Sequence, residues 1–427
     1  MHHRHPPGSG SVNFPGRELE DGRDFPFTLP GLTAVDQPES PETRAARGGW
    51  YREFQTRPST PPVFLTTAFD VDGLEQLEGM TTGREYGYVY TRDGNPNHDA
   101  LAADVAALEG GPSGAVFASG MGAMTATLLA MVKSGDHVVA ARVLYGRTAQ
   151  MLNHLASSFG VRVTFVDAND PSAFARALTA QTRLAIVETV SNPLMEVADL
   201  PAIAGVLGDV PLLVDNTFAT PSLVRPIEHG ARLVFHSGSK YLNGHGDVML
   251  GVMVGESGLI RKIKGLGALY GVNSNPFESW LASRGLRTLS LRMQRVCATA
   301  AELAPFLATL PGVSRVYYPG LPTHASHAIA QRIMPAGFGG MLAFELPGGQ
   351  PAVARLFRAL GETIPFSPTL ADARTTVSYP AGTSHKFLTA QERAECGITD
   401  GLVRLSVGLE DAGTLRRELQ AALAQLS

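Results

Sequence analysis

Short apolar runs recur along the middle of the chain, and segments with helical spacing separate most of them. The runs that we interpret as strands are residues 115–119, 137–141, 184–189, 211–216 and 232–237, and residues 161–167 alternate like a strand. Between them, the spacing of helices is found at residues 98–108, 121–132 and 150–159. Strands that alternate with helices predict an α/β fold with a mainly parallel central sheet.

The pattern changes between residues 285 and 295. Residues 284–310 predict one long amphipathic helix, with a kink or break at Pro305. Separated strands at 340–346 and 403–409 and a closing helix at 411–426 indicate a smaller α+β domain at the C-terminal end. We therefore expect a large domain over residues 94–291 and a small domain over residues 292–427.

Residues 1–93 lack this regular alternation, and we interpret them as an N-terminal extension followed by an intersubunit arm. The extension, up to about residue 48, is rich in Pro, Gly, Ser and Arg, which predicts a flexible segment. His2, His3 and His5 in this extension could bind a metal adventitiously, but we interpret them as part of a disordered tail. The following stretch holds turn signals and alternating tyrosines, as in an extended segment, and we expect it to reach another subunit.

Composition excludes several classes of function. Among 427 residues, 35 Lys and Arg face 39 Asp and Glu, so the net charge is −4. This balance gives no electrostatic footprint for nucleic acid, and no basic run suits an anionic membrane surface. The two cysteines, Cys297 and Cys396, exclude a disulfide scaffold and a CxxC metal or redox site. We predict no metal site.

One stretch, residues 110–132, is uncharged and long enough to span a bilayer. Its many glycines, Pro112 and several hydroxyl residues favour a buried strand, a turn and a helix instead. The N-terminal residues lack the apolar core of a signal peptide. We therefore expect a cytoplasmic protein with no membrane partner.

One lysine stands in an unusual setting. A buried strand ends at Phe235, and the segment HSGSKYLNGHGD (236–247) then crowds small residues around Lys240. Ser237 and Ser239 beside it can donate hydroxyl hydrogen bonds to an anion. A lysine amine suits Schiff-base chemistry when its pKa is lowered. An exposed turn lysine explains this segment, taken alone, equally well.

Two further segments supply the groups that such a lysine needs. Asp215 ends an apolar run, and a buried carboxylate requires a cationic partner, for which a protonated pyridine nitrogen would serve. A helix cap or a buried salt bridge is the alternative role for Asp215. The segment ASGMGAM (118–124), with Ser119, Gly120 and Met121, lies at a strand-to-helix transition, where backbone N–H groups and the helix dipole bind anions. Together these groups meet the requirements of pyridoxal phosphate.

From about Pro61 to the C-terminus, the chain resembles the Cys/Met-metabolism enzymes that depend on pyridoxal phosphate, the cystathionine γ-synthase-like group of fold type I. The motifs that carry the resemblance, in chain order, are TPPVFLTTAF, YTRDGNPN, ASGMGAM, YGRT, ETVSNPLMEVAD, VDNTFATP, HSGSKYLNGHGD, NPFESWLASRGLRTL and VRLSVGLED. The resemblance implies the fold type I architecture, in which the large domain binds the cofactor. It also implies a homotetramer built as a dimer of dimers.

The resemblance implies a role for each matching residue around the cofactor. Lys240 would form the Schiff base and shuttle the Cα proton, and Asp215 would pair with the pyridinium nitrogen. Tyr145 would stack on the ring and take part in proton transfer. The phosphate would be bound at the turn and the lysine segment, by backbone groups of Gly120 and Met121 and by Ser119, Ser237 and Ser239. Asn192 would lie near the ring oxygen, and Tyr90 and Arg92 would reach the phosphate in a neighbouring subunit.

The resemblance also implies how the substrate is bound. Arg404 would clamp the substrate α-carboxylate, a bidentate task that suits a guanidinium group. Thr369 falls where many relatives have a serine near the substrate and the lysine, and Tyr145 would contact the substrate as well. From the residues alone, core packing for Tyr90, a turn role for Asn192 and a surface charge for Arg404 remain alternatives.

Several positions depart from the family's patterns and bear on the reaction. Arg147 stands where methionine γ-lyases often carry a cysteine, and it could project a charge toward the distal end of the substrate or face solvent. Pro368 stands where cystathionine enzymes often place a glutamate. Residues 375–398 look closest to O-acylhomoserine sulfhydrylases, although methionine γ-lyases share parts of this segment. Tyr379 replaces the usual histidine there, and Asn97 replaces a usual threonine elsewhere.

These patterns lead us to expect γ-replacement on an O-acyl-L-homoserine by a sulfur nucleophile, in sulfur amino-acid metabolism. The alternative is a C–S lyase, a methionine γ-lyase or a cystathionine γ- or β-lyase, that releases a 2-oxo acid, ammonia and a thiol. Lys240, Asp215 and Arg404 argue against a non-catalytic binding protein. A nicotinamide dehydrogenase is disfavoured because the Rossmann glycine fingerprint is missing from the sequence.

Overall fold

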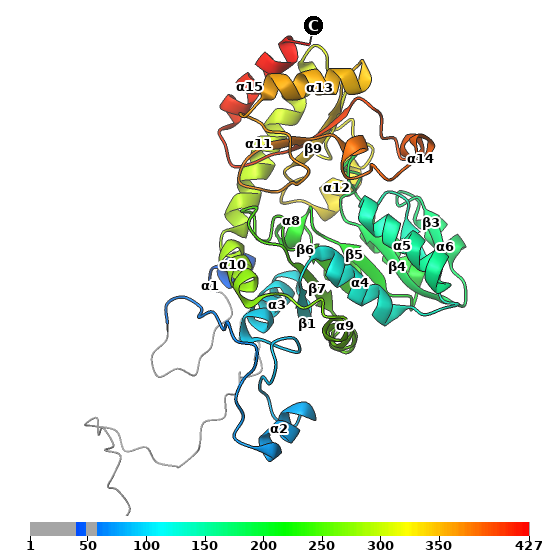
Figure 1. Cartoon of the computed structure of the whole chain (residues 1–427). Helices are drawn as coiled ribbons and strands as arrows, with labels where there is room; N and C mark the ends of the chain where they lie inside the picture. Colours follow the sequence, from blue (N-terminus) through cyan, green and yellow to red (C-terminus); the bar gives the residue numbers. More distant parts are fainter. Residues whose placement is uncertain (1–39, 48–57, 427) are drawn as a thin grey trace, which may run out of the picture.

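The computed structural model describes residues 40–47 and 58–426, which are organised around two β-sheets (Figure 1). The larger sheet has seven strands in the order β1-β7-β6-β5-β4-β2-β3. All run parallel except β7, which is antiparallel to both of its neighbours. The strands are β1 (Ser113–Phe117), β2 (His137–Ala141), β3 (Arg162–Val166), β4 (Thr182–Glu188), β5 (Leu212–Asp215), β6 (Leu233–Ser237) and β7 (Gly251–Gly255). The predicted α/β fold with a mainly parallel sheet is confirmed.

Helices cover this sheet, with α3, α4 and α9 packed against β1 or β7 and with α5 and α6 packed against β3. The helices that precede or surround the large sheet are α1 (Pro41–Arg47), α2 (Leu74–Thr81), α3 (Pro96–Glu109), α4 (Gly120–Met131), α5 (Gly146–Phe159), α6 (Pro171–Ala177), α7 (Leu200–Leu207), α8 (Thr220–Leu223), the 3-10 helix η1 (Pro226–His229), α9 (Ser257–Leu269) and α10 (Pro276–Leu286). Because the sheet is covered, its central strands β2, β5 and β6 are largely apolar and buried, whereas the edge strand β3 alternates between exposed and more buried residues.

The second sheet is antiparallel and has four strands in the order β10-β11-β9-β8. Its strands are β8 (Arg315–Tyr317), β9 (Met341–Glu345), β10 (Thr376–Ser378) and β11 (Leu402–Ser406). The helices that follow the large sheet are α11 (Leu289–Thr309), α12 (His327–Ile333), α13 (Gly349–Leu360), the 3-10 helix η2 (Pro380–Gly382), α14 (Ala390–Glu395) and α15 (Ala412–Ala424). Helices α11, α13 and α15 lie in the same half of the molecule as this sheet (Figure 1). Apolar side chains of these helices form one core with the sheet.

The boundary between the two predicted domains stays a prediction. The long helix α11 contributes Val296 to the core around the large sheet and Leu303 to the core around the small sheet. It therefore joins the two halves rather than dividing them at a single residue.

The predicted strands are present. The short strands β8 and β10 are missing from the sequence-based assignment, and so is β7. Its sequence, GVMVG, begins and ends with glycine, which lowers the strand propensity of so short a run. Both glycines are needed for close packing. A Cβ atom on Gly251 would collide with the carbonyl oxygen of Ser119, and one on Gly255 would collide with that of Arg232. A glycine inside a strand often marks such a close backbone approach.

The prediction of one long helix over residues 284–310 is wrong. Helix α10 ends at Leu286, α11 begins at Leu289, and Pro305 lies inside α11 without ending it. The buried Arg292 stabilises the break, because its Nη2 donates to the carbonyl oxygen of Gly285 (2.9 Å) at the end of α10. Its Nε also donates to Thr288 Oγ1 (3.1 Å). A cationic side chain that satisfies the last carbonyls of a helix favours its end there.

Part of the predicted flexible extension is helical. Residues 41–47 form α1, which packs against α3 and α11. Glu42 accepts a hydrogen bond from Ser290 (3.2 Å), and Arg44 forms an ion pair with Asp104 (3.6 Å). The interpretation of this segment as flexible is therefore wrong for residues 41–47. The other residues of the extension, His2, His3 and His5 included, lie outside the described residues.

The uncharged stretch 110–132 forms β1 and α4, as predicted, and both pack in the core around the large sheet. Within residues 40–47 and 58–426, none of the helices combines the length and the apolar composition that crossing a bilayer requires.

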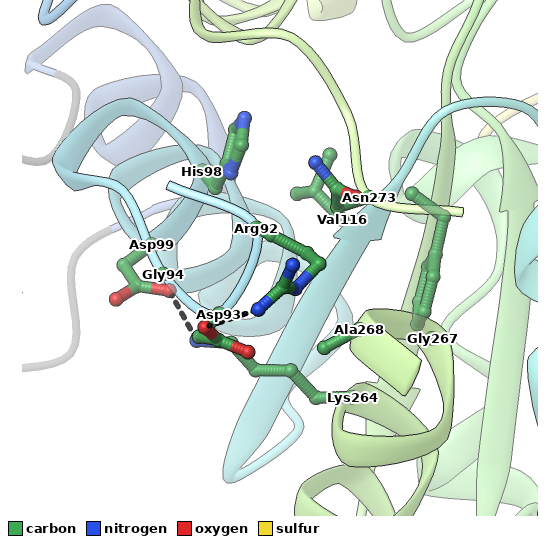
Figure 2. A pocket seen from close by; sticks show the side chains of 11 residues that line it. Arg92, Asp93, Gly94, His98, Asp99, Val116, Lys264, Gly267, Ala268 and Asn273 are labelled. Atoms are coloured by element: carbon green, nitrogen blue, oxygen red, sulfur yellow. Dashed lines mark hydrogen bonds and ion pairs between the residues drawn. The ribbon is translucent and has the colours of Figure 1, made fainter. Parts of the chain in front are cut away.

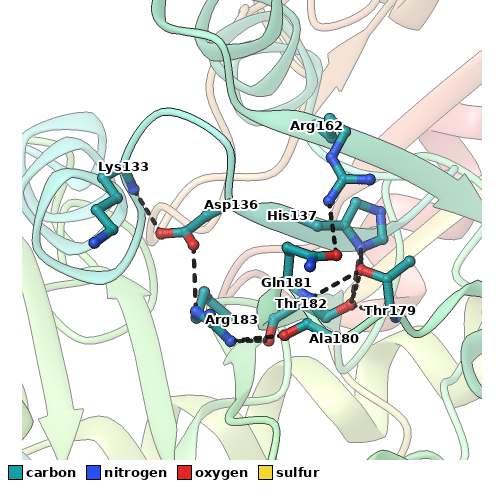
Figure 3. A network of polar contacts seen from close by, with 9 residues as sticks. All are labelled: Lys133, Asp136, His137, Arg162, Thr179, Ala180, Gln181, Thr182 and Arg183. Atoms are coloured by element: carbon teal, nitrogen blue, oxygen red, sulfur yellow. Dashed lines mark hydrogen bonds and ion pairs between the residues drawn. The ribbon is translucent and has the colours of Figure 1, made fainter.

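Polar contacts join β2, β3 and β4 at their amino ends (Figure 3). His137 Nδ1 lies 2.8 Å from Thr182 Oγ1, and its Nε2 lies 2.9 Å from Thr164 Oγ1. Burial lowers the pKa of His137, so the ring remains neutral at neutral pH. Asp136 forms an ion pair with Arg183 (3.3 Å) at the same edge. These groups satisfy one another, whereas the groups suited to chemistry follow the opposite ends of the strands.

Candidate active site

The carboxyl ends of the parallel strands bring most of the predicted residues to one edge of the large sheet. In α/β sheets, ligands bind outside this edge. The residues that follow these strand ends are Ser119, Gly120 and Met121 after β1, Tyr145 after β2, Asn192 after β4, Asp215 at the end of β5, and Ser237, Ser239 and Lys240 at and after β6. Residues that are far apart in the sequence thus share one edge because the strands run in the same direction.

The turn from β1 into α4 forms an anion cradle. Ser119 is the N-cap of α4, and its Oγ accepts a hydrogen bond from the N–H of Gly122 (2.9 Å). The N–H groups of Gly120 and Met121 precede the first intrahelical hydrogen bond, so they can bind an anion at the positive end of the helix. A Cβ atom on Gly120 would lie 3.2 Å from Phe235 and Ser237, so a larger residue would narrow the cradle.

The two serines after β6 differ in their contacts. The N–H of Ser237 donates to Thr217 Oγ1 (2.9 Å), and its side chain lies beside Gly120 at the cradle. The Ser239 hydroxyl accepts from the N–H of Leu250 (3.0 Å) and lies 3.4 Å from the carbonyl oxygen of Leu250. Ser239 therefore anchors the chain before β7, and Ser237 is the serine beside the cradle.

Lys240 is a partly buried residue and not an exposed turn lysine. Its Nζ donates to Thr369 Oγ1 (2.7 Å), which comes from the loop before β10. Burial, followed by the nearby charge of Arg404, lowers the pKa of Lys240 to about 8. Arg292 stabilises the loop that contains Lys240, because its Nη1 donates to the carbonyl oxygen of Tyr241 (2.6 Å). The amine is thus positioned and more easily deprotonated than a solvated lysine.

Asp215 is a carboxyl group without a cationic hydrogen-bond partner among the described residues. Its Oδ1 accepts from the N–H of Thr217 (2.9 Å), and no ion pair in the described part of the chain involves it. It does not cap the following helix, whose N-cap is Ala219. Burial raises its pKa, while hydrogen bonds from Thr217 and the nearby His236 act in the opposite direction. A cation beside Asp215 would restore its ionised form.

Arg404 lies in the middle of β11, and its side chain is fully buried. Its Nη1 donates to Asn192 Oδ1 (2.9 Å), and its Nη2 approaches the carbonyl oxygen of Thr369 (3.4 Å). Its Nε is buried without a partner within the described ranges. Burial lowers the pKa of Arg404 to about 10, so the group stays cationic at neutral pH. A buried cation with an unused donor suits a carboxylate ligand.

Tyr145 follows β2 at this edge of the sheet, and 40% of its surface is exposed. Tyr90 and Arg92 lie elsewhere on the same chain. The Arg92 guanidinium stacks 4.8 Å from the centre of the Tyr90 ring, and Arg92 forms an ion pair with Asp93 (3.6 Å). Figure 2 shows Arg92 in a small pocket beside Lys264. No hydrogen bond or ion pair of the described residues joins Tyr90 or Arg92 to Lys240, so their expected role in a neighbouring subunit stays a prediction.

Two polar residues of this region are absent from the sequence-based assignment. Glu188 ends β4 beside Asp215, and it carries the same signal as Asp215, a carboxylate at the end of an apolar strand. His385 is buried, and burial together with Arg404 lowers its pKa to about 4. Its Nδ1 lies 2.8 Å from Ser384 Oγ. No sequence signal distinguishes His385 from an ordinary loop histidine.

The residues present fit pyridoxal phosphate. The cradle at Gly120 suits a phosphate, the Lys240 amine suits an aldehyde, and Asp215 suits a ring nitrogen that carries a proton. The unused Nε of Arg404 suits the carboxylate of an amino acid. Each of these groups has a physical reason to bind the corresponding part of the cofactor or of an amino acid.

Comparison with known proteins agrees with this chemistry. A family described as "Cys/Met metabolism PLP-dependent enzyme" matches residues 42–424. The chain is 40% identical to an L-methionine gamma-lyase of Porphyromonas gingivalis, over 90% of this chain and 97% of that protein. It is 37% identical to an O-succinylhomoserine sulfhydrylase of Pseudomonas aeruginosa, over 85% of this chain and 90% of that protein.

Among solved structures, the cystathionine gamma synthase of Xanthomonas oryzae pv. oryzae, in complex with aminoacrylate and cysteine, is similar. Its TM-score is 0.86 at 36% identity, over 91% of this chain and 99% of that chain. The family match spans most of the chain, and the relatives include lyases and synthases of sulfur amino acids. The chain therefore belongs to the Cys/Met-metabolism family of enzymes and depends on pyridoxal phosphate.

Proposed function

We propose that this enzyme catalyses γ-replacement on an O-acyl-L-homoserine, in which a sulfur nucleophile displaces the acyl group as a carboxylate. The products are a carboxylic acid and homocysteine or a thioether, depending on whether sulfide or a thiol attacks. The observation that carries this choice over a lyase is the cationic environment of Arg147 beside Tyr145.

Arg147 lies in the first turn of α5, two residues after Tyr145. Its guanidinium lies 4.2 Å from the centre of the Phe387 ring, and the Nζ of Lys386 lies 5.1 Å from the same ring. Arg147 also donates to Gln150 Oε1 (2.7 Å), and no ion pair in the described ranges involves Arg147 or Lys386. Ester and carboxylate oxygens of an acyl group are good acceptors for these cations, whereas the thioether sulfur of methionine is a weak one.

The proposed residue roles rest on the family resemblance, and the contacts at the sheet edge support them. Ser119, Gly120, Met121 and Ser237 would hold the phosphate, and Ser239 would support this site by anchoring the adjoining chain to Leu250. Asp215 would pair with the ring nitrogen, Tyr145 would stack on the ring, and Asn192 would lie near the ring oxygen. Pyridoxal phosphate, when bound, supplies the acceptor for the electron pair that the Cα–H bond releases. Arg404 holds the substrate carboxylate, with Thr369 between it and Lys240.

Lys240 moves the protons in this proposal. Its amine takes the proton from Cα, and a second proton is then removed from Cβ as the Cγ–O bond breaks and the acyl group leaves with the bonding electrons. A thiolate adds at Cγ, and the two protons return to Cβ and Cα. Replacing Lys240 with Ala should abolish turnover, and substantial activity of the folded variant would contradict this assignment.

A C–S lyase is the second candidate, and the similarity to an L-methionine gamma-lyase favours it. Both reactions share the early proton transfers and differ after the leaving group departs. A sulfur nucleophile gives replacement, whereas hydrolysis gives 2-oxobutanoate and ammonia.

Product analysis by mass spectrometry separates the two candidates. The protein with pyridoxal phosphate is incubated with O-acetylhomoserine, O-succinylhomoserine, methionine, cystathionine or cysteine, each with and without sulfide or a thiol. Homocysteine or a new thioether from an acylhomoserine supports γ-replacement. A 2-oxo acid as the main product, without incorporation of the thiol, would establish the lyase instead.

The role of Arg147 is tested by Arg147→Gln. We expect the KM for the acylhomoserine to rise roughly tenfold, because a charge-assisted hydrogen bond is lost. Arg355→Gln is the matched control, since Arg355 is an exposed arginine on α13. An unchanged KM in Arg147→Gln would show that Arg147 does not recognise the acyl group.

We further propose that the enzyme works as a cytoplasmic homotetramer, a dimer of dimers. Tyr90 and Arg92 would complete the phosphate site of the neighbouring subunit. Both side chains are exposed and stack on each other, and no hydrogen bond or ion pair of the described residues joins them to Lys240 of their own chain, which supports this assignment.

A further inference from the structure

Glu188 is a buried residue with no role in the function proposed above. Only 8% of its surface is exposed. Its Oε1 accepts a hydrogen bond from the backbone N–H of Tyr145 (2.5 Å), and its Oε2 accepts one from the backbone N–H of Asn192 (3.2 Å). One carboxylate therefore joins the loop after β2 to the loop after β4.

The loop after β2 carries Tyr145, and the loop after β4 carries Asn192, which contacts the proposed substrate arginine. The Asn192 side chain accepts from Arg404 Nη1 (2.9 Å), and Arg404 Nη2 approaches the carbonyl oxygen of Thr369 (3.4 Å). Thr369 in turn accepts from Lys240 Nζ (2.7 Å). A continuous chain of contacts thus runs from Glu188 through Asn192 and Arg404 to the lysine.

The electrostatic setting of Glu188 is costly, so its retention needs a physical reason. No ion pair in the described part of the chain involves it, and two backbone N–H groups are its hydrogen-bond donors. It lies in register with Asp215 on the neighbouring strand, so both side chains project from the same face of the sheet. Burial and the charge of Asp215 raise the pKa of Glu188 well above its usual value, whereas the hydrogen bonds from the backbone N–H groups of Tyr145 and Asn192 favour the ionised form. Burying a carboxyl group without a cationic partner is destabilising, and hydrogen bonds offset only part of that cost. We therefore look for a function in the two hydrogen bonds that Glu188 accepts.

Only a carboxylate of this length satisfies both donors. Two backbone N–H groups require two acceptor oxygens, and a glutamine offers one oxygen and an NH2 group. The amide would then place a donor against the N–H of Tyr145 or of Asn192. An aspartate keeps both oxygens but is one methylene shorter.

We propose that Glu188 is a positioning residue that fixes the backbones of Tyr145 and Asn192. It thereby holds the tyrosine at the cofactor ring and the asparagine–arginine pair at the substrate carboxylate. The inference rests on the roles proposed above for Tyr145, Asn192 and Arg404. It does not depend on whether the reaction is a replacement or an elimination.

The test compares Glu188→Gln with Glu256→Gln. Glu256 follows β7, whose carboxyl end lies at the opposite edge of the sheet, and it pairs with Arg232. For Glu188→Gln we expect the Kd for pyridoxal phosphate, measured by titration of the apoprotein, to rise at least about tenfold, because one buried N–H loses its acceptor. The visible circular dichroism of the bound cofactor should decrease, and the KM for the amino acid should rise. Glu256→Gln should match the wild type in all three.

A purely structural role predicts a different result. Glu188→Gln would then melt at a lower temperature, while its folded fraction would keep the cofactor Kd, the visible circular dichroism and the KM of the wild type. That outcome overturns the proposal. Failure of the proposed reaction would change the products of the wild type and leave these cofactor measurements intact, so the two failures are distinguishable.

A second measurement uses the wild-type protein and covers the case in which Glu188→Gln does not fold. Hydrogen–deuterium exchange of the apoprotein should show the Tyr145 and Asn192 amides protected before any cofactor is added. Exchange of both amides at the rate of an unstructured peptide would overturn the proposal, since a positioning carboxylate must hold them in advance.

Discussion

At the scale of single residues, the chemistry depends on the contacts of two cationic side chains, Lys240 and Arg404. Lys240 donates to Thr369, and Arg404 lies close enough to disfavour a second positive charge. A solvated lysine is almost fully protonated at neutral pH and is then no nucleophile. The environment of Lys240 therefore makes its amine usable near the pH at which the enzyme has to work.

This lowered pKa predicts a pH dependence for cofactor capture. The apoprotein should bind pyridoxal phosphate through the amine at a rate that rises with pH and levels off above a midpoint of about 8. Stopped-flow absorbance measures the rate, with Lys240→Ala as the unreactive control. A midpoint near 10.5, the ordinary pKa of a lysine, would mean that Lys240 is solvated.

The same shift bears on the stability of the apoprotein. Between pH values of about 8 and 10.5, the unfolded chain keeps a proton on Lys240 that the folded chain has released. The free energy of unfolding therefore increases as the pH rises through that window, so this group makes the folded apoprotein more stable at the upper end.

Arg404 predicts a separate effect on substrate binding. In Arg404→Lys, the ammonium group cannot hold Asn192, the carbonyl oxygen of Thr369 and a carboxylate at once. We expect the KM for the amino acid to rise about tenfold or more, with a smaller change in the cofactor Kd. Steady-state kinetics and cofactor titration measure the two. Arg295→Lys, on the exposed side of α11, is the control, and equal KM values in both variants would contradict the prediction.

At the scale of secondary structure elements, the cap of α4 links helix stability to anion binding. In Ser119→Ala the N–H of Gly122 loses its acceptor, which costs about 1 kcal/mol. We expect a lower melting temperature and a several-fold higher cofactor Kd. Asp411→Ala removes the comparable cap of α15, where Asp411 accepts from the N–H of Thr414 (2.8 Å). A cofactor Kd that rises equally in Asp411→Ala would contradict a local effect.

The elements also show where a pattern of apolar residues fails. Helical spacing continues from α10 into α11, so the sequence predicts one helix over 284–310. The break at residues 287 and 288 depends on Arg292, which bonds to the end of α10 and to the loop of Lys240 at once. The contacts of Arg292 depend on the Lys240 loop, which lies about fifty residues earlier in the chain. The spacing of apolar residues within 284–310 carries no information about that loop.

At the scale of the whole molecule, the site joins two sheets. The hydrogen bonds from Lys240 to Thr369 and from Arg404 to Asn192 connect the edge of the large sheet to the half of the chain that contains the small sheet. Relative movement of these two halves would therefore change the positions of the amine and of the substrate arginine together.

The proposed subunit exchange of Tyr90 and Arg92 predicts complementation. Lys240→Ala and Arg92→Ala should each be inactive or weakly active. Co-refolding them in equal amounts should restore about a quarter of the wild-type activity, because half of the dimers are mixed and each mixed dimer has one intact site. Lys240→Ala mixed with Asp215→Ala should restore none. A mixture no more active than Arg92→Ala alone would contradict a shared site.

Much of the fold and of the candidate site could be predicted from the sequence. Apolar runs and helical spacing are local, so they predicted the strands of the parallel sheet, and the polar residues at their ends predicted the cofactor chemistry. The lysine, the aspartate and the anion cradle lie directly at strand ends. The direction of parallel strands then brings them to one edge.

Other features depended on the tertiary structure. The pairing of Lys240 with Thr369 and of Arg404 with Asn192 joins residues more than a hundred positions apart, and no local pattern specifies such a partner. Glu188 is a carboxylate at a strand end like Asp215, yet its two backbone donors come from different loops. The sequence by itself determined the apolar runs that form most strands of the large sheet and the chemistry of the residues at their ends. Packing decided which of these groups meet, because hydrogen bonds depend on positions in space rather than on spacing along the chain.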